Sequence, residues 1–465
     1  MRLLMSREWF AMLLSFSLPL AWPQGNPVSE TSPGYRIVAP ASRLLAQARP
    51  ARRFAATPHS EPASGPVPPV VPGEYRDLYA SLEGRLAEIK GHLDTADSQS
   101  RYAVNFSAEL LAADNIQMLV KPEFYESAIT PYLNGLESMS VKGVKVQMGF
   151  PILYEPFFTE FLKQPALYQE YLAFYKRLVA DVHRHGMKYI AQCQEVQAER
   201  GRFIRVREYF QTLSFGDYQA RRSEFLVNVA RQLKPDYLLV QTEPDTEASN
   251  SGRPELLDPV KDARMITRFL ADLQDAGAHT MVVGCGMGSW LQQYRELTDA
   301  LVRIPDLDLI DIHIYPINIV GRGDMWQRAE DIANTALAHH KKVGVSECWL
   351  YKSRSNELGH REHDELRIRN VFSFWAPLDQ QFIQAMVKLA TIKQMDFMSV
   401  NWSMHFFSYL DYDSTERACG GRCSFPELNR QAYSAARQAL RQGSLSDTGR
   451  TYSALIRQST GAGER

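Results

Sequence analysis

Short apolar runs alternate with longer amphipathic stretches along the chain from Tyr102 onward. Each apolar run is rich in Val, Ile, Leu and Tyr, and such continuous runs are typical of strands buried on both faces of a parallel sheet with helical crossovers. The pattern occurs eight times. It predicts strands at Tyr102–Ala108, Val144–Pro151, Lys188–Glu195, Tyr237–Glu243, Thr280–Gly286, Leu307–Tyr315, Lys342–Trp349 and Phe397–Ser403.

The stretches between these runs have apolar residues at helical spacing. The spacing predicts helices at Tyr168–His185 and Asp262–Ala276, and the glycine that follows each of them is a common helix C-terminal signal. A third helix is predicted at Glu330–Lys341. Before the first strand, Tyr75–Leu93 predicts a helix that closes the bottom of the sheet structure or packs beside it.

Eight strand–helix units in about 340 residues are the pattern of an α/β protein with a (β/α)8 TIM barrel fold. An open, doubly wound sheet usually has fewer strands and a glycine-rich first turn, and the first predicted strand lacks that turn. We therefore expect residues 74–445 to form one barrel domain and residues 446–465 to be a C-terminal tail.

The N-terminal region has a different composition. Residues 10–22 carry no charge and form an apolar run that is too short to span a bilayer, which takes about 20 residues. The run suits a secretory signal peptide over residues 1–25, followed by a disordered, proline-rich linker over residues 26–73. We expect a secreted or periplasmic protein with no stable membrane span after signal removal. The alternative is a misassigned start followed by a disordered tail.

The overall charge is close to zero, with 52 Lys and Arg against 53 Asp and Glu. A protein held to nucleic acid by phosphate contacts normally has a basic excess, so a nucleic-acid partner is not expected. The chain has five cysteines, and Cys419 and Cys423 frame a short loop in which a disulfide is plausible for an exported protein. We expect a monomer without cofactor or metal.

Active sites of (β/α)8 barrels lie at the C-terminal ends of the strands. Glu243 ends the fourth predicted strand and Glu347 ends the seventh, nearly across the barrel from each other. Burial raises the pKa of a carboxyl, and a neighbouring carboxylate raises one of the two further. Glycoside hydrolysis needs one protonated carboxyl as the acid and one ionised carboxylate as the nucleophile.

On these residues the chain resembles the clan A glycoside hydrolases, the superfamily of retaining (β/α)8 glycosidases. The resemblance covers about residues 102–409 and rests on the architecture and on short motifs. It implies that Glu243, in the sequence TEP, is the general acid/base and that Glu347, in SEC, is the nucleophile. It also implies that Tyr315, in the segment DIHIYP, orients the nucleophile and that Trp402 forms the floor of a sugar subsite.

Further residues at strand ends are candidates for binding a carbohydrate substrate: Thr242, His313, Glu109 and Glu195. For Glu109 and Glu195 the alternative is that they support the catalytic pair. Thr242 departs from the family, which usually has an asparagine there that binds the sugar 2-hydroxyl. The end of the second strand also lacks the arginine that many members place near the nucleophile. Trp290 and Trp349 are interpreted as loop packing rather than as subsite residues.

These departures keep a second function open, a non-catalytic carbohydrate-binding barrel. A third class, a phosphate-binding aldolase or a metal hydrolase on the same fold, has weaker support. The only glycine-rich candidate for a phosphate loop, Gly420–Gly421, lies well beyond Trp402, and only His313 and His405 stand at strand ends as histidine metal ligands.

Overall fold

The computed structural model describes residues 70–95, 103–110, 125–194, 205–278, 280–315, 324–354, 357, 366, 368–420 and 423–459. The expected signal peptide and almost all of the expected linker lie outside these ranges. So do Glu195 and parts of the loops that follow β1, β3, β6 and β7.

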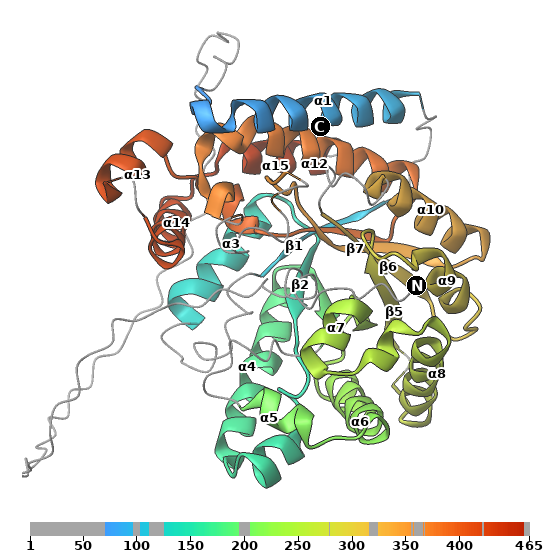
Figure 1. Ribbon diagram of the computed structural model, residues 1–465. Helices are drawn as coiled ribbons and strands as arrows, with labels where there is room; N and C mark the ends of the chain where they lie inside the picture. Colours follow the sequence, from blue (N-terminus) through green and yellow to red (C-terminus); the bar gives the residue numbers. More distant parts are fainter. Residues whose placement is uncertain are drawn as a thin grey trace, which may run out of the picture.

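Eight parallel strands form a closed barrel in the described part of the chain, which confirms the (β/α)8 fold (Figure 1). Neighbouring strands pair in sequence order, and β1 closes the barrel against β8 through pairs such as Ala108 with Val400. The strands are β1 Asn105–Glu109, β2 Gly143–Gln147, β3 Lys188–Gln192, β4 Tyr237–Gln241, β5 Val282–Gly288, β6 Leu309–Ile314, β7 Lys342–Cys348 and β8 Phe397–Val400.

The strands end earlier than the apolar runs predict at several positions. β4 ends at Gln241, so Thr242 and Glu243 lie just beyond the strand. β8 ends at Val400, because the backbone of Trp402 turns into the left-handed region with φ 49°. Thr242, Glu243 and Trp402 therefore lie just beyond the strands, at the end of the barrel where active sites of (β/α)8 proteins form.

Helices surround the barrel (Figure 1). Several begin at clear signals: Asp324 caps α10, Asp258 caps α8, and α4 begins at Pro165. The α-helices are α1 Arg76–Asp94, α3 Thr130–Ser138, α4 Pro165–Arg184, α5 Val206–Gln211, α6 Phe215–Leu233, α7 Pro244–Ser251, α8 Pro259–Asp275, α9 Tyr294–Leu301, α10 Met325–Ala338, α12 Ala376–Ile392, α13 Tyr412–Cys419, α14 Phe425–Gln442 and α15 Asp447–Ser459.

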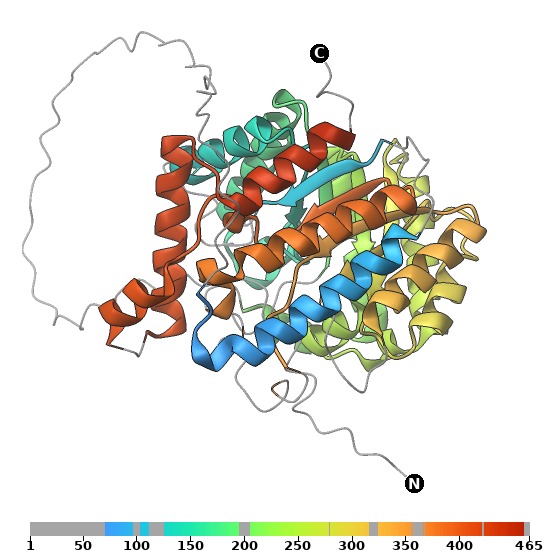
Figure 2. The same cartoon turned by 90° about the horizontal axis from the view of Figure 1, so that it is seen from above.

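Helix α1 packs beside the barrel rather than across its bottom. It lies along α12 in both views (Figures 1 and 2), where Tyr79 stacks on Trp375 and Lys388 pairs with Asp94. Of the two placements expected for this helix, the structure therefore has the lateral one.

The described part of the C-terminal segment is a packed helix, which corrects the expectation of a tail for residues 447–459. Asp447–Ser459 forms α15, which lies against α12 in both views (Figures 1 and 2). Tyr452 of α15 is fully buried and donates its hydroxyl to the carbonyl oxygen of Ser107 in β1 at 2.9 Å. Since the apolar face of α15 is buried against the barrel, this helix is part of the domain.

The barrel interior is layered. A small apolar cluster of Ile190, Tyr237, Leu239, Leu309 and Phe397 lies apart from the larger core between strands and helices. These residues lie at the start or in the middle of their strands, so they fill the lower part of the barrel, toward its N-terminal end. Toward the C-terminal end, buried polar side chains replace them, including Lys145, Gln192 and His313.

Two strands have an irregular register. Leu239 and Gln241 of β4 pair with the consecutive residues Gly284 and Cys285 of β5, so β4 carries one extra residue. β7 also carries one extra residue between Val345 and Cys348, relative to β8. Bulges re-aim side chains and are enriched beside active sites, and these two lie directly before Glu243 and around Glu347.

No helix in the described ranges combines the length and the apolar character that a membrane crossing needs.

Candidate active site

Glu243 and Glu347 meet at the C-terminal end of the barrel, with His313 between them. Each glutamate is only 3% exposed, and His313 is fully buried. One carboxylate oxygen from each glutamate and one ring nitrogen of His313 lie within 4.8 Å of one another. The barrel therefore brings together the two carboxyl groups that the sequence singles out.

Glu347 is held by four donors. Its Oε1 accepts from Lys145 Nζ at 3.2 Å and from Gln192 Nε2 at 2.8 Å. Its Oε2 accepts from the Tyr315 hydroxyl at 2.6 Å and from Asn401 Nδ2 at 3.0 Å. Burial by itself raises the pKa of this carboxyl, but Lys145, His313 and the hydrogen bonds outweigh burial and hold the pKa at about 2. Glu347 is therefore an ionised carboxylate across the physiological pH range.

Glu243 has a different environment. Its Oε1 accepts from His313 Nδ1 at 2.6 Å, and its Oε2 accepts from the Thr246 hydroxyl at 2.5 Å. Burial raises the pKa of Glu243 above its usual range, and the charge of Glu347 adds to the rise; the contact with His313 acts in the opposite direction without cancelling it. The two glutamates are thus shifted in opposite directions.

His313 is the cation between them. Burial lowers its pKa, but the negative charge of Glu347 and the contacts with Asp311 and Glu243 raise it to about 10. Its Nε2 lies 2.8 Å from the Ser346 hydroxyl, which in turn donates to Asp311 at 2.6 Å. Glu243, His313 and Glu347 also have the spacing of metal ligands, but a protonated imidazole offers no lone pair to a metal. The chemistry of the set favours a hydrogen-bonded triad.

Glu109 and Lys145 form a buried ion pair beside Glu347. Lys145 Nζ lies 3.0 Å from Glu109 Oε1, and Glu109 Oε2 accepts the backbone N–H of Trp402 at 3.0 Å. The sequence leaves Glu109 either to bind sugar hydroxyls or to support the catalytic pair, and in the structure its two oxygens are engaged by Lys145 and Trp402. Lys145 of β2 thus places a cation beside Glu347.

The hydroxyl of Thr242, the residue before Glu243, has two hydrogen-bond partners. Its hydroxyl accepts from Gln192 Nε2 at 3.1 Å and donates to Gln194 Oε1 at 2.8 Å. Since both hydrogen-bonding directions of this hydroxyl are used within the protein, Thr242 links β3 to β4 in this structure.

A group of aromatic rings adjoins Glu347 through Tyr315, whose hydroxyl donates to this glutamate. The ring centre of Tyr315 lies 6.0 Å from that of Trp402 and 6.0 Å from that of Trp290, and Trp349 lies 6.2 Å from Trp402. The sequence interpretation of Trp290 as loop packing is incomplete, because this ring also lies 6.4 Å from that of His313. Gly288 makes room for it, since a Cβ there would approach the Trp290 ring to 2.2 Å.

The structure brings together most of the residues expected at the site. Glu243, Glu347, His313, Tyr315 and Trp402 converge, Thr242 and Glu109 support their neighbours, and Glu195 lies outside the described residues. Sequence reasoning gave no role to Lys145, Gln192 or Asn401. A signal was available for two of them, because polar residues inside the apolar runs of β2 and β3 indicate a buried partner.

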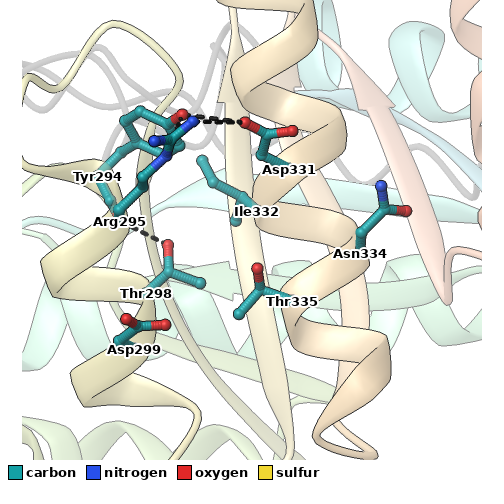
Figure 3. Close-up of a pocket in the computed structure, with 8 residues that line it drawn as sticks. All are labelled: Tyr294, Arg295, Thr298, Asp299, Asp331, Ile332, Asn334 and Thr335. Carbon is teal, nitrogen blue, oxygen red and sulfur yellow. Dashed lines mark hydrogen bonds and ion pairs between the residues drawn. The ribbon is translucent and has the colours of Figure 1, made fainter.

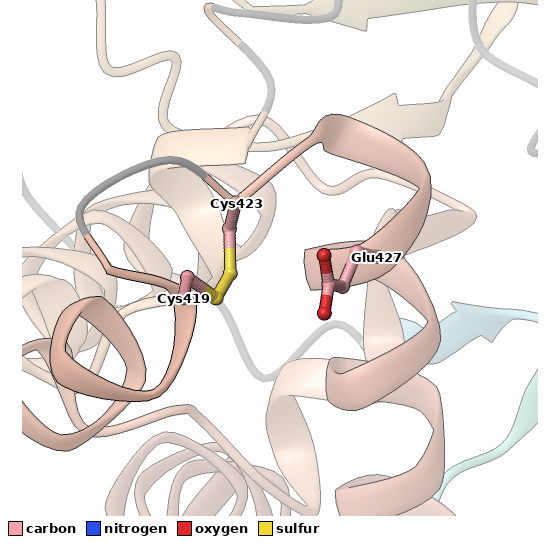
Figure 4. Close-up of side chains that lie close together, drawn as sticks. All are labelled: Cys419, Cys423 and Glu427. Carbon is pink, nitrogen blue, oxygen red and sulfur yellow. A yellow bond between two sulfur atoms is a disulfide. The ribbon is translucent and has the colours of Figure 1, made fainter.

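Two other features in the described ranges lie away from this site. A cavity of about 360 Å³ between α9 and α10 is lined by Tyr294, Arg295, Asp331 and neighbouring polar residues (Figure 3). Cys419 and Cys423 form a disulfide beside Glu427 (Figure 4). That pairing agrees with the expected loop, and it leaves neither sulfur as a thiolate for a metal.

The chain matches no protein-family model and no curated protein sequence. Solved structures similar to it include a GH5_18 protein from Bifidobacterium longum in complex with Manβ1-4GlcNAc, with 15% identity, a TM-score of 0.43 and coverage of 76% of this chain and 78% of that chain. A family 1 β-glucosidase from Thermotoga maritima has 12% identity, a TM-score of 0.40 and coverage of 61% and 78%.

An endo-β-1,4-glucanase from Xanthomonas axonopodis pv. citri has 10% identity, a TM-score of 0.42 and coverage of 70% and 89%. The GH5_18 protein and the family 1 β-glucosidase belong to the clan that the sequence resembles.

Proposed function

We propose that this chain is a retaining glycoside hydrolase that cleaves O-glycosidic bonds of an extracellular or periplasmic oligosaccharide or polysaccharide. The observation that carries the proposal is the pair of buried glutamates, whose oxygens approach within 4.8 Å and whose pKa values move in opposite directions. Retaining enzymes have carboxyl groups about 5–5.5 Å apart, whereas inverting enzymes leave about 6.5–9.5 Å for a water molecule.

In the first step, protonated Glu243 donates its proton to the glycosidic oxygen while a carboxylate oxygen of Glu347 attacks the anomeric carbon. The bond to the leaving group breaks and a covalent glycosyl–Glu347 intermediate forms. In the second step, Glu243 takes a proton from water, whose oxygen displaces Glu347 and releases the sugar with retained configuration.

The surrounding residues support these two charge states. His313 balances the charge of Glu347 at 3.8 Å and donates to Glu243. Lys145, Gln192, Tyr315 and Asn401 hold Glu347 ionised in one orientation. The aromatic rings of Trp402 and Trp290 offer apolar faces of the kind that stack on sugar rings.

The pH dependence of activity follows from the same assignment. Glu347 must be ionised, so activity is lost only as the pH falls toward about 2. Glu243 must be protonated in the first step, so activity falls as the pH rises through its elevated pKa. We expect a bell-shaped profile of kcat/KM with these two limbs.

The test uses a panel of 4-nitrophenyl β-glycosides with the wild-type chain and three variants. Glu347→Gln removes the nucleophile and is expected to abolish turnover, and Glu243→Gln is expected to lower kcat by about 10²–10⁴-fold. Glu296→Gln, at an exposed glutamate of α9, is the matched control and keeps wild-type activity. Circular dichroism and thermal unfolding show whether each variant is folded.

Two further readouts define the mechanism. Proton NMR of the first-formed product reports retention or inversion at the anomeric carbon. A 2-deoxy-2-fluoro glycoside should leave a sugar on the peptide that contains Glu347, detected by mass spectrometry. Undiminished hydrolysis by folded Glu347→Gln excludes Glu347 as the nucleophile.

A non-catalytic carbohydrate-binding barrel is the second candidate. The observation that favours it is the 2.6 Å contact between His313 and Glu243, because a cationic partner opposes protonation of the acid. Sugar binding by the wild-type chain without turnover of any panel member supports this candidate instead.

We also propose that the chain is exported, on the basis of the apolar N-terminal run, and that it is a monomer. N-terminal sequencing of the mature protein, with fractionation of the producing cells and light scattering, tests both points. An intact Met1 on protein from the cytoplasmic fraction contradicts export.

A further inference from the structure

Two side-chain amides flank Glu347 in the same way. Gln192, at the end of β3, donates its Nε2 to Glu347 Oε1 at 2.8 Å. Asn401, just after β8, donates its Nδ2 to Glu347 Oε2 at 3.0 Å. Each oxygen of the carboxylate therefore has an amide nitrogen beside it. Gln192 precedes Glu347 in the chain and Asn401 follows it.

The partner determines how each amide is oriented. An ionised carboxylate only accepts hydrogen bonds, so the nitrogen of each amide must face Glu347 and the carbonyl oxygen must face away from it. The Gln192 nitrogen also donates to Thr242, and the Asn401 nitrogen also contacts the Tyr315 hydroxyl, which gives the same orientation.

Both carbonyl oxygens are buried acceptors with no hydrogen-bond partner among the described residues. Gln192 is fully buried and Asn401 is 2% exposed, so bulk water does not serve them. An unsatisfied buried polar atom is destabilising, and native proteins retain few of them. Two such atoms beside one carboxylate indicate that a ligand completes the set.

Their position follows from the amide group. Because the nitrogen and oxygen share one carbon, through bonds of about 1.3 and 1.2 Å, each free oxygen lies within about 6 Å of a Glu347 oxygen. A sugar ring whose anomeric carbon meets Glu347 carries its hydroxyl groups within this distance range. A carbonyl oxygen accepts only, so it selects a hydroxyl and disfavours a position that is deoxygenated or etherified.

We propose, on the basis of the glycosidase function above, that Gln192 and Asn401 are substrate-binding residues whose carbonyl oxygens each accept a hydrogen bond from a hydroxyl group of the sugar ring that Glu347 attacks. Each amide then joins the nucleophile to one hydroxyl of the substrate. Thr242 does not make such a contact, because its hydroxyl is already hydrogen-bonded to Gln192 and Gln194.

The experiment is a double-mutant cycle between protein and substrate. The substrates are the 4-nitrophenyl β-glycoside that the wild-type chain hydrolyses fastest and its 2-, 3-, 4- and 6-deoxy analogues. The proteins are wild type, Gln192→Met, Asn401→Leu and Tyr315→Phe. The last variant is the matched control, because it removes a donor to Glu347 without removing either free carbonyl oxygen.

In the wild type, two of the deoxy analogues are expected to lose about 10-fold to 100-fold in kcat/KM. Gln192→Met should abolish the loss for one of these analogues and Asn401→Leu for the other, so that parent and analogue react within 2-fold of each other. Tyr315→Phe should slow all five substrates by the same factor. If both amide variants also slow all substrates equally, the amides only position Glu347 and the inference is overturned.

Failure of the proposed function has a separate signature. If the wild type hydrolyses no panel member, calorimetry with gluco-, manno- and galacto-configured 1-deoxynojirimycin replaces kinetics. One outcome is that Gln192→Met and Asn401→Leu each weaken binding at least 5-fold while Tyr315→Phe does not. This outcome overturns the hydrolase function and supports the two hydroxyl contacts. Absence of binding, or equal binding by all variants, overturns the inference as well.

Discussion

At the scale of single residues, the site depends on a balance of buried charges. Glu347 and Glu109 are carboxylates with Lys145 between them, and His313 adds a second cation on the other side of Glu347. Removing one partner of a buried pair leaves the other uncompensated, which is costly. The proposed nucleophile role of Glu347 therefore depends on Lys145, which the sequence shows only as a polar position in an apolar strand.

Lys145→Met tests this dependence. Without the ammonium group the pKa of Glu347 should rise from about 2 toward its ordinary value of 4.5. Activity needs the ionised form, so the acidic limb of the kcat/KM profile should move to higher pH by at least about one pH unit, and activity near pH 4 should fall most. Lys145→Arg keeps a cation, so the acidic limb of its kcat/KM profile should return toward the lower pH of the wild type.

Lys142→Met is the control, because Lys142 is exposed just before β2. Its profile should match that of the wild type. An acidic limb that stays in place in folded Lys145→Met contradicts a role for Lys145 in keeping Glu347 ionised.

At the scale of elements, the apolar runs predicted all eight strands, but the details that shape the site come from contacts between strands. β5 has the sequence VVGCGMG, and its glycines allow close approach to β6 and to Trp290. A Cβ on Gly286 would lie 1.9 Å from the backbone oxygen of Asp311. Asp311 accepts from Ser346, which contacts His313, so the spacing of β5 and β6 affects the triad.

Gly286→Ala should therefore destabilise the domain by about 1–3 kcal/mol or more, because backbone rather than a flexible side chain must move. Urea unfolding measures the change. Gly84→Ala is the control: Gly84 lies in α1 with open space around it, and alanine there should be neutral or stabilising by up to about 1 kcal/mol. Equal stabilities of the two variants contradict the close contact between β5 and β6.

At the scale of the whole molecule, two sets of contacts join the beginning of the barrel to the end of the chain. β1 pairs with β8, and α15 then returns to β1 and α12, so the last helix covers the seam of the barrel. The ring of Tyr452 packs between those of Phe106 and Phe406, with centroid distances of 6.4 Å and 5.0 Å. A helix at this place supports the strand that delivers Glu109.

Two substitutions measure that support. Tyr452→Phe loses one buried hydrogen bond and should cost about 0.5–1.5 kcal/mol. Tyr452→Ala also loses the ring and should cost about 3–5 kcal/mol. Gln458→Ala, on the exposed face of α15, should stay within about 0.5 kcal/mol of the wild type. Thermal unfolding that does not distinguish Tyr452→Ala from Gln458→Ala contradicts a structural role for α15.

The sequence by itself determined the barrel and the positions of Glu243 and Glu347, because buried parallel strands and amphipathic helices leave periodic patterns over a few residues. It did not determine the partners of the two glutamates. Lys145 and Glu347 are 202 residues apart, and Glu109 and Trp402 are 293 residues apart. Only closure of the barrel brings such residues together and sets which buried carboxyl keeps its charge, since pKa values depend on burial and on neighbouring charges in space rather than on the order of residues along the chain.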